Sequence, residues 1–274
     1  MIRNRNAIRL LCLFCLLVYP AINANLEAQT IIGQRNDSVS HPLIRHQLGF
    51  DLRPGYIVST HSFLQGDNMQ QKKIDQSLSF HFKYAFRFSK ESNLGRLFPH
   101  TYQGIGISYH TFFNPAELGN PVSVYVFQGS RIAQLSPRLS FDYEWNFGAS
   151  FGWRKYDELS NPQNVLIGSK INAYINLGFL LNWQVHKYWK LAAGVDLTHF
   201  SNGNTHYPNG GLNVIGGRIG IVRTLGETDE AAGSITPGRL FIKPHVSYDL
   251  VVYGATRKRG LIGDDVSSMI PGSF

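Results

Sequence analysis

The chain has 274 residues, a formal net charge of +8, 13% aromatic residues and 27 glycines. Its two cysteines, Cys12 and Cys15, lie in one N-terminal apolar stretch, so disulfides cannot stabilise the rest of the chain. The positive balance favours contact with anionic phosphate groups, and the need for solubility explains it equally well. We expect no nucleic-acid partner, because no binding motif is recognisable in a chain that begins with an export signal.

The N-terminus has the pattern of a secretory signal peptide. Three arginines between residues 3 and 9 precede an apolar core from Leu10 to Ile22, and small residues follow at Ala24 and Ala28. This core is too short for a transmembrane helix, which needs about 20 apolar residues. We therefore predict a signal peptide at 1–28 and an N-terminal segment at 29–46.

The run at 78–88 shows the clearest alternation. Every even position is large and apolar, and every odd position is polar or small. Successive side chains of a β-strand point to opposite faces, so one face carries six large apolar groups and the other carries cations and a histidine. This pattern is typical of an outer-membrane strand, with its apolar face toward lipid and its polar face toward the lumen.

Further runs of similar length repeat the pattern and predict an all-β fold. They lie near 47–59, 103–113, 122–134, 139–147, 171–183, 190–200, 211–223 and 238–253. With 78–88 they give nine strands of about the 9–11 residues that a tilted membrane strand needs. We predict an antiparallel transmembrane β-barrel of eight or more strands over 47–256. A secreted soluble barrel or sandwich is the alternative.

The tail at 257–274 does not alternate, and we expect no strand in it. Its last residue, Phe274, is the aromatic type found at the C-terminus of outer-membrane barrels. We interpret the tail as the end of a shortened barrel sequence, since single-chain bacterial barrels normally have an even number of strands.

The chemistry-bearing residues follow the run at 190–200. His199 and Ser201 are two positions apart, so their side chains share one strand face with Cβ atoms about 6–7 Å apart. Leu197 has the same parity, which places this face toward lipid. Asn213 has the lipid-facing parity of the next strand, and the short loop between the strands predicts a hairpin that unites all three. The alternative is that they lie in the polar interface and simply end the strands.

Other polar candidates have ordinary explanations. His81, His110 and Asp142 have lumen parity, where polar side chains are expected in a barrel. Glu144 has the same parity, and we expect it to pair with a basic neighbour. His206 follows the motif in the loop and is expected to be solvated.

The stretch from His199 to Asn213 resembles the lipid A 3-O-deacylase family of outer-membrane enzymes. The shared motif is His-x-Ser-Asn followed by Pro-Asn-x-Gly, and it matches here over about 15 residues without gaps. The resemblance implies that Ser201 is the nucleophile, His199 its base, and Asn202 with Gly203 the oxyanion or substrate-binding residues.

One position departs from that family. Where its members carry a glutamate to orient the histidine, this chain has Asn213. Outer-membrane phospholipase A is similar in using His-x-Ser-Asn-Gly with an asparagine as third member. It has an arginine after that glycine, tied to a calcium site, whereas this chain has Asn204. The loop favours the deacylase and the third member favours the phospholipase. We give the loop more weight and predict a serine esterase that removes an ester-linked acyl chain from lipid A, with phospholipase A as the alternative.

Both resemblances imply one reaction at the bacterial outer membrane. His199 takes the proton of Ser201, the serine attacks an acyl ester, and water then releases a fatty acid. We expect Asn213 to accept the second ring proton of His199 and no cofactor or metal to be required. The expected partner is lipid A, lipopolysaccharide or phospholipid, and the chain is a monomer or a homodimer. A structural or transport barrel is the non-enzymatic alternative.

Overall fold

The computed structural model describes residues 44–89, 92–226, 252–259 and 266–273. The expected signal peptide and almost all of the expected N-terminal segment lie outside these residues. The described chain contains two short helices, α2 (Ser62–Gln65) and α3 (Asn93–Leu97), and neither is long and apolar enough to cross a membrane.

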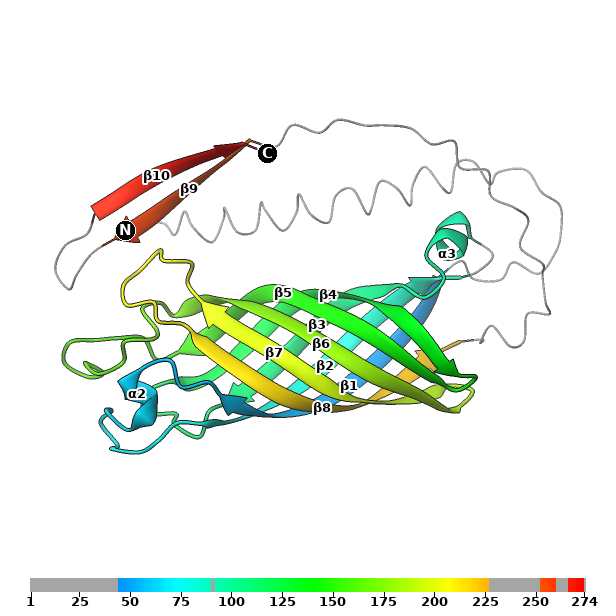
Figure 1. Ribbon diagram of the computed structural model, residues 1–274, viewed down its shortest axis with the longest axis horizontal. Helices are drawn as coiled ribbons and strands as arrows, with labels where there is room; N and C mark the ends of the chain where they lie inside the picture. Colours follow the sequence, from blue (N-terminus) through cyan, green and yellow to red (C-terminus); the bar gives the residue numbers. More distant parts are fainter. Residues whose placement is uncertain (1–43, 90–91, 227–251, 260–265, 274) are drawn as a thin grey trace. The chain divides into compact units, whose positions relative to one another are not determined.

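Eight antiparallel strands form a closed barrel (Figure 1). Each strand pairs with the next along the chain, and the eighth pairs with the first. Their bounds are β1 (Ile44–Ile57), β2 (Gln76–Phe88), β3 (Tyr102–Thr111), β4 (Gly119–Ser136), β5 (Leu139–Trp153), β6 (Ile171–His186), β7 (Trp189–Ser201) and β8 (Leu212–Leu225).

Closure corrects the expected number of nine barrel strands. β8 pairs with β1 from Leu225 opposite His46 to Val214 opposite Ile57, so the sheet has no free edge for a ninth strand. The barrel therefore ends at Leu225, well before the expected boundary at 256. The run that gave the extra strand, 238–253, lies outside the described residues except for its last two positions.

The C-terminal tail contains strands that its sequence pattern did not predict. β9 (Val252–Arg259) and β10 (Val266–Ser273) pair antiparallel as a separate two-stranded sheet. The expectation of no strand beyond 257 is therefore wrong. A two-stranded sheet needs only backbone pairing, and this pairing does not require the alternation that a membrane imposes on side chains.

The alternation of the barrel strands is confirmed by their exposure. In β2, Phe80 and Phe82 are exposed on the outer wall, whereas His81 and Lys83 are almost fully buried in the lumen. The same division holds in β7, where Val195 and Leu197 are exposed. The protein is thus an outer-membrane type of β-barrel with an apolar exterior and a polar interior.

The two ends of the barrel differ in the length of their connections. At one end, which we call the turn end, β4–β5 and β6–β7 are joined by the short turns 137–138 and 187–188, and β2–β3 by the longer connection 89–101. At the other, the loop end, the connections are 58–75, 112–118, 154–170 and 202–211. Figure 1 shows α2 among the long loops and α3 at the opposite end.

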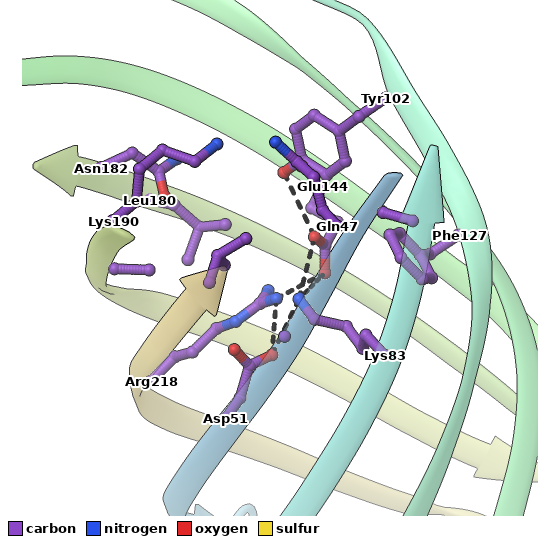
Figure 2. Close-up of a pocket in the computed structure, with 14 residues that line it drawn as sticks. Gln47, Asp51, Lys83, Tyr102, Phe127, Glu144, Leu180, Asn182, Lys190 and Arg218 are labelled. Carbon is purple, nitrogen blue, oxygen red and sulfur yellow. Dashed lines mark hydrogen bonds and ion pairs between the residues drawn. The ribbon is translucent and has the colours of Figure 1, made fainter. Parts of the chain in front are cut away.

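A cluster of six charged side chains fills the middle of the lumen, and Figure 2 shows Asp51, Lys83, Glu144 and Arg218 of this cluster. Three are acidic and three are basic, and all are at least 94% buried as side chains: Asp51, Glu144, Asp196, Arg53, Lys83 and Arg218. Arg218 contacts Asp51 at 2.7 Å and Glu144 at 2.5 Å. Lys83 contacts the same two carboxylates at 2.9 and 3.1 Å. The predicted pairing of Glu144 with basic neighbours is confirmed.

A layer of aromatic and imidazole rings lies between this cluster and the loops. Tyr174 and Phe200 are almost completely buried, with ring centroids 5.5 Å apart, and Phe200 also packs on Trp153 at 5.0 Å. Apolar residues of the loops, among them Leu166 and Ile167, are equally buried. Because charged groups and then rings occupy the lumen, its interior is a packed core.

The lumen cluster generates a stability prediction. Arg218→Met should lower the free energy of unfolding by about 3–5 kcal/mol, because Asp51 and Glu144 would lose a buried partner. Arg223→Met is the matched control on the same strand, since Arg223 is exposed and lies over the Trp189 ring at 5.4 Å. It should cost about 1 kcal/mol or less. Urea unfolding of both variants in lipid vesicles measures the difference, and equal losses would contradict the role assigned to the cluster.

Candidate active site on the outer wall

His199 and Asn213 form a hydrogen-bonded pair across two strands. They are direct partners in the register of β7 and β8, which brings their side chains together on one face. His199 Nδ1 lies 2.7 Å from Asn213 Oδ1. The amide oxygen can only accept, so this contact places the ring proton on Nδ1 and leaves Nε2 with a free lone pair. The predicted contact is present, and its catalytic role stays a prediction.

The pair faces outward from the barrel. Phe200, between His199 and Ser201, is only 1% exposed and packs in the lumen, so its two neighbours lie on the outer wall. His199 lies opposite Ile175 of β6, and Leu197 lies opposite Ile215 of β8. These apolar neighbours are exposed on the lipid-facing surface. The site is therefore at the loop end of an apolar wall.

Ser201 is the last residue of β7 and lies opposite Ala173. It shares its face with His199 and is partly buried. Within the described part of the chain, no hydrogen bond joins the Ser201 hydroxyl to His199. Contacts between a nucleophile and its base are often long without substrate and shorten in the complex. The strand thus places the two groups on one face in the predicted order, without a hydrogen bond between them.

Asn202 holds the loop that follows. Its backbone N–H donates to Asn209 Oδ1 at 3.0 Å, and its side-chain amide donates to the carbonyl of His206 at 2.8 Å. Asn209 in turn donates to Asn204 Oδ1 at 2.8 Å. The backbone N–H and the side-chain amide of Asn202 therefore both donate inside the loop, and its expected oxyanion role stays a prediction.

Gly203 presents a more accessible donor. Its φ of +63° lies in the left-handed region that favours glycine, and a Cβ there would meet no atom within 4 Å. Among the hydrogen bonds of the described residues, none involves the Gly203 N–H. The Gly203 N–H lies two residues after Ser201 in the sequence. It can therefore donate to a negative charge that develops near the serine.

Gly211 is a site residue to which the sequence motif assigned no role. It has a φ of +68°, and a Cβ there would lie 3.2 Å from His199 Cε1 and 3.7 Å from Ser201 Cβ. The glycine therefore leaves space beside both side chains. In the sequence, Gly211 could have been identified by its position as the last residue of the Pro-Asn-x-Gly motif.

Three other histidines singled out in the sequence are not next to His199 and Ser201 in the strand register. His81 contacts Ser79 and Tyr125 in the lumen, both at 2.9 Å, and His110 contacts Ser123 there at 3.0 Å. Their lumen parity, like that of Asp142, is confirmed by burial. His206 is exposed in the loop, as expected. The described residues contain no group of three histidine, cysteine or acidic side chains placed to hold a metal ion.

Comparison with known proteins adds a family match to this geometry. The family model of lipid A 3-O-deacylase (PagL) matches residues 48–222, well over half of the chain. The chain belongs to this family. The match covers nearly the whole barrel and includes the motif from His199 to Asn213. A search of curated proteins gives no match.

Solved barrels are similar only at a distance. The Neisserial surface protein A (NspA) is 8% identical, with 65% of this chain and 96% of that chain covered and a TM-score of 0.43. The outer membrane enzyme PagL is 13% identical, with coverage of 63% and 97% and a TM-score of 0.38. The N-terminal barrel of Pseudomonas aeruginosa OprF is 7% identical, with coverage of 64% and 96% and a TM-score of 0.36. The family assignment rests on the sequence match.

The position of Gly211 generates a prediction about the site. Gly211→Ala should slow the labelling of Ser201 by a fluorophosphonate about tenfold or more, because a Cβ at this φ of +68° strains the backbone and crowds the Phe200 carbonyl at 3.1 Å and His199 Cε1 at 3.2 Å. Gly217→Ala is the matched control on β8, since a Cβ there meets no atom within 4 Å. It should label at the wild-type rate. Equal rates for wild type and Gly211→Ala would show that the ring position is not critical.

Proposed function

We propose that the protein is an outer-membrane serine esterase that removes an ester-linked acyl chain from lipid A. The observation that carries the proposal is the His199–Asn213 pair beside Ser201, on the outer wall of a barrel of the lipid A 3-O-deacylase family. The amide fixes the ring, the ring is the base, and the serine is the nucleophile. No cofactor or metal enters this scheme.

The reaction follows from the tautomer that Asn213 imposes. His199 Nε2 takes the proton of the Ser201 hydroxyl while Oγ attacks the ester carbonyl of the lipid. The Gly203 N–H donates to the oxyanion of the tetrahedral intermediate. Collapse gives an acyl-serine, and His199 returns the proton to the departing lipid alcohol. Water, activated by the same nitrogen, then releases the fatty acid and restores Ser201.

The surroundings of the site support a membrane-resident substrate. Exposed Leu197 and Ile215 lie on the membrane side of the pair and exposed Ile175 lies beside His199, so acyl chains can pack there. Bacterial barrels place their long loops outside the cell, so the loop end corresponds to the outer leaflet, in which lipid A resides. A polar cluster on a lipid-facing wall is costly, and a reaction on a lipid ester gives a reason for it. The net charge of +8 also suits a phosphorylated substrate.

Phospholipase A activity is the second candidate, favoured by the amide at Asn213. However, outer-membrane phospholipase A has a calcium-linked arginine where this chain has Asn204. The Asn204 side chain is hydrogen-bonded to Asn209 within the loop. Transport is less well supported, because side chains fill the lumen at the charged cluster and at the ring layer. We therefore favour lipid A as the substrate.

Mass spectrometry of lipid A and phospholipids tests the proposal. The experiment compares three cultures of one host strain with the same outer membrane, which express wild type, Ser201→Ala or Ser123→Ala. We expect wild type and Ser123→Ala to remove one acyl chain from lipid A, and Ser201→Ala to leave it intact. Ser123 is the matched control because it contacts His110 inside the lumen.

The two lipid pools separate the candidate functions. If wild type produces lysophospholipid and leaves lipid A intact, and Ser201→Ala produces no lysophospholipid, the assignment would move to phospholipase A. An unchanged lipid A profile between wild type and Ser201→Ala would reject the deacylase.

The third member of the site gives a separate prediction. Asn213→Glu should retain or raise the rate of acyl release, because a carboxylate can accept the same ring proton and also stabilise the imidazolium. Asn213→Leu should lower the rate about 100-fold, since the ring loses its fixed tautomer. Steady-state rates on purified lipid A measure both. Loss of activity in Asn213→Glu would show that the site requires a neutral amide.

A further inference from the structure

The four long loops of the barrel are joined by a continuous set of hydrogen bonds. Glu117, in the loop at 112–118, is only 1% exposed. Its Oε1 accepts from the Met69 N–H of the first loop at 2.8 Å. Its backbone carbonyl accepts from the side-chain amides of Asn161 and Asn164 at 2.9 and 2.8 Å. One residue thus connects three loops.

Asn164 connects this set of hydrogen bonds to the loop at 202–211, which borders the candidate active site. Its Oδ1 accepts from the N–H groups of Leu166 and Ile167, both at 3.1 Å, and forms a compact turn. That turn directs the carbonyls of Val165 and Leu166 toward the loop at 202–211. They accept from the N–H groups of Gly210 and Gly211, both at 3.2 Å. Asn164 itself is completely buried.

The contact continues along the same two segments. A Cβ at Gly168 would overlap the backbone of His206 and Pro208, so the two loops lie directly against each other there. The far end of the contact is Gly211, beside His199 and Ser201. The backbone that borders the reactive pair is therefore held from the β5–β6 loop.

We propose that Asn164 is a positioning residue for the reaction at Ser201. It touches neither Ser201 nor His199, and it acts by holding Gly210 and Gly211 in place through the Val165 and Leu166 carbonyls. This inference rests on the proposed function. It extends the site to a loop that lies outside the His-x-Ser-Asn motif.

The test compares Asn164→Ala with Asn164→Ser. Alanine removes the acceptor that forms the turn, so kcat for lipid A should fall about 10- to 100-fold with KM within about twofold. Serine keeps an uncharged acceptor for the same type of turn and should restore part of kcat. Asn68→Ala is the matched control, because Asn68 is a buried loop asparagine that accepts from Lys72 N–H and donates to the Phe63 carbonyl. It should leave kcat within about twofold of wild type.

Two further readouts separate positioning from loss of folding and from a wrong substrate. The urea midpoint of the barrel should be the same for Asn164→Ala and Asn68→Ala. The rate of Ser201 labelling by a fluorophosphonate should fall in Asn164→Ala and partly recover in Asn164→Ser, whatever the natural lipid is. If wild type leaves lipid A intact but labelling follows this order, the proposed function fails and the positioning role stands. Equal labelling or equal kcat in wild type and Asn164→Ala, or equal losses in Asn68→Ala, would overturn the role.

Discussion

The pairing of β8 with β1 is the constraint from which the rest of the structure follows. In a membrane, unpaired backbone N–H and C=O groups cost several kcal/mol each, so a spanning sheet must close on itself. Closure gives every strand an inner and an outer face, and the two faces alternate residue by residue. Once Phe200 packs inside, His199 and Ser201 must lie outside. The location of the candidate site is thus a consequence of the way the barrel closes.

An eight-stranded barrel has little room inside, and this chain fills the middle of that room with a cluster of three acidic and three basic side chains. Each member of the central cluster contacts a partner of opposite sign, as Arg218 does with Asp51 and Glu144. Such a lumen offers stability but no route for a lipid. Any chemistry on a membrane substrate must then occur on the outer wall, where the strands end at the loops. The filled interior and the outward site are therefore consistent with each other.

The sequence predicted what depends on local spacing. Alternation identified the barrel strands and assigned Glu144 to the lumen, and the two-residue spacing placed His199 with Ser201. The prediction of a barrel of eight or more strands is confirmed, but the count of nine runs exceeded the eight barrel strands because closure is a contact between the first and last strands, which no local period encodes. The β9–β10 hairpin was missed because it lacks the alternation that a membrane imposes. The roles of Asn164 and Gly211 depend on loops brought together in space, with Val165 and Gly210 far apart along the chain.

The uncharged amide of Asn213 suits its position on the outer wall of the barrel. Asn213 lies on the outer wall one step beyond exposed Ile215, so a charge there would be only partly hydrated. An amide oxygen orients His199 at 2.7 Å without that desolvation cost. In the proposed reaction it also supplies less stabilisation of the imidazolium than a carboxylate would. More of the stabilisation must then come from donors to the oxyanion, which depend on the backbone geometry of the β7–β8 loop. An uncharged third member and a loop held tightly from its neighbour are, by this argument, two parts of one arrangement.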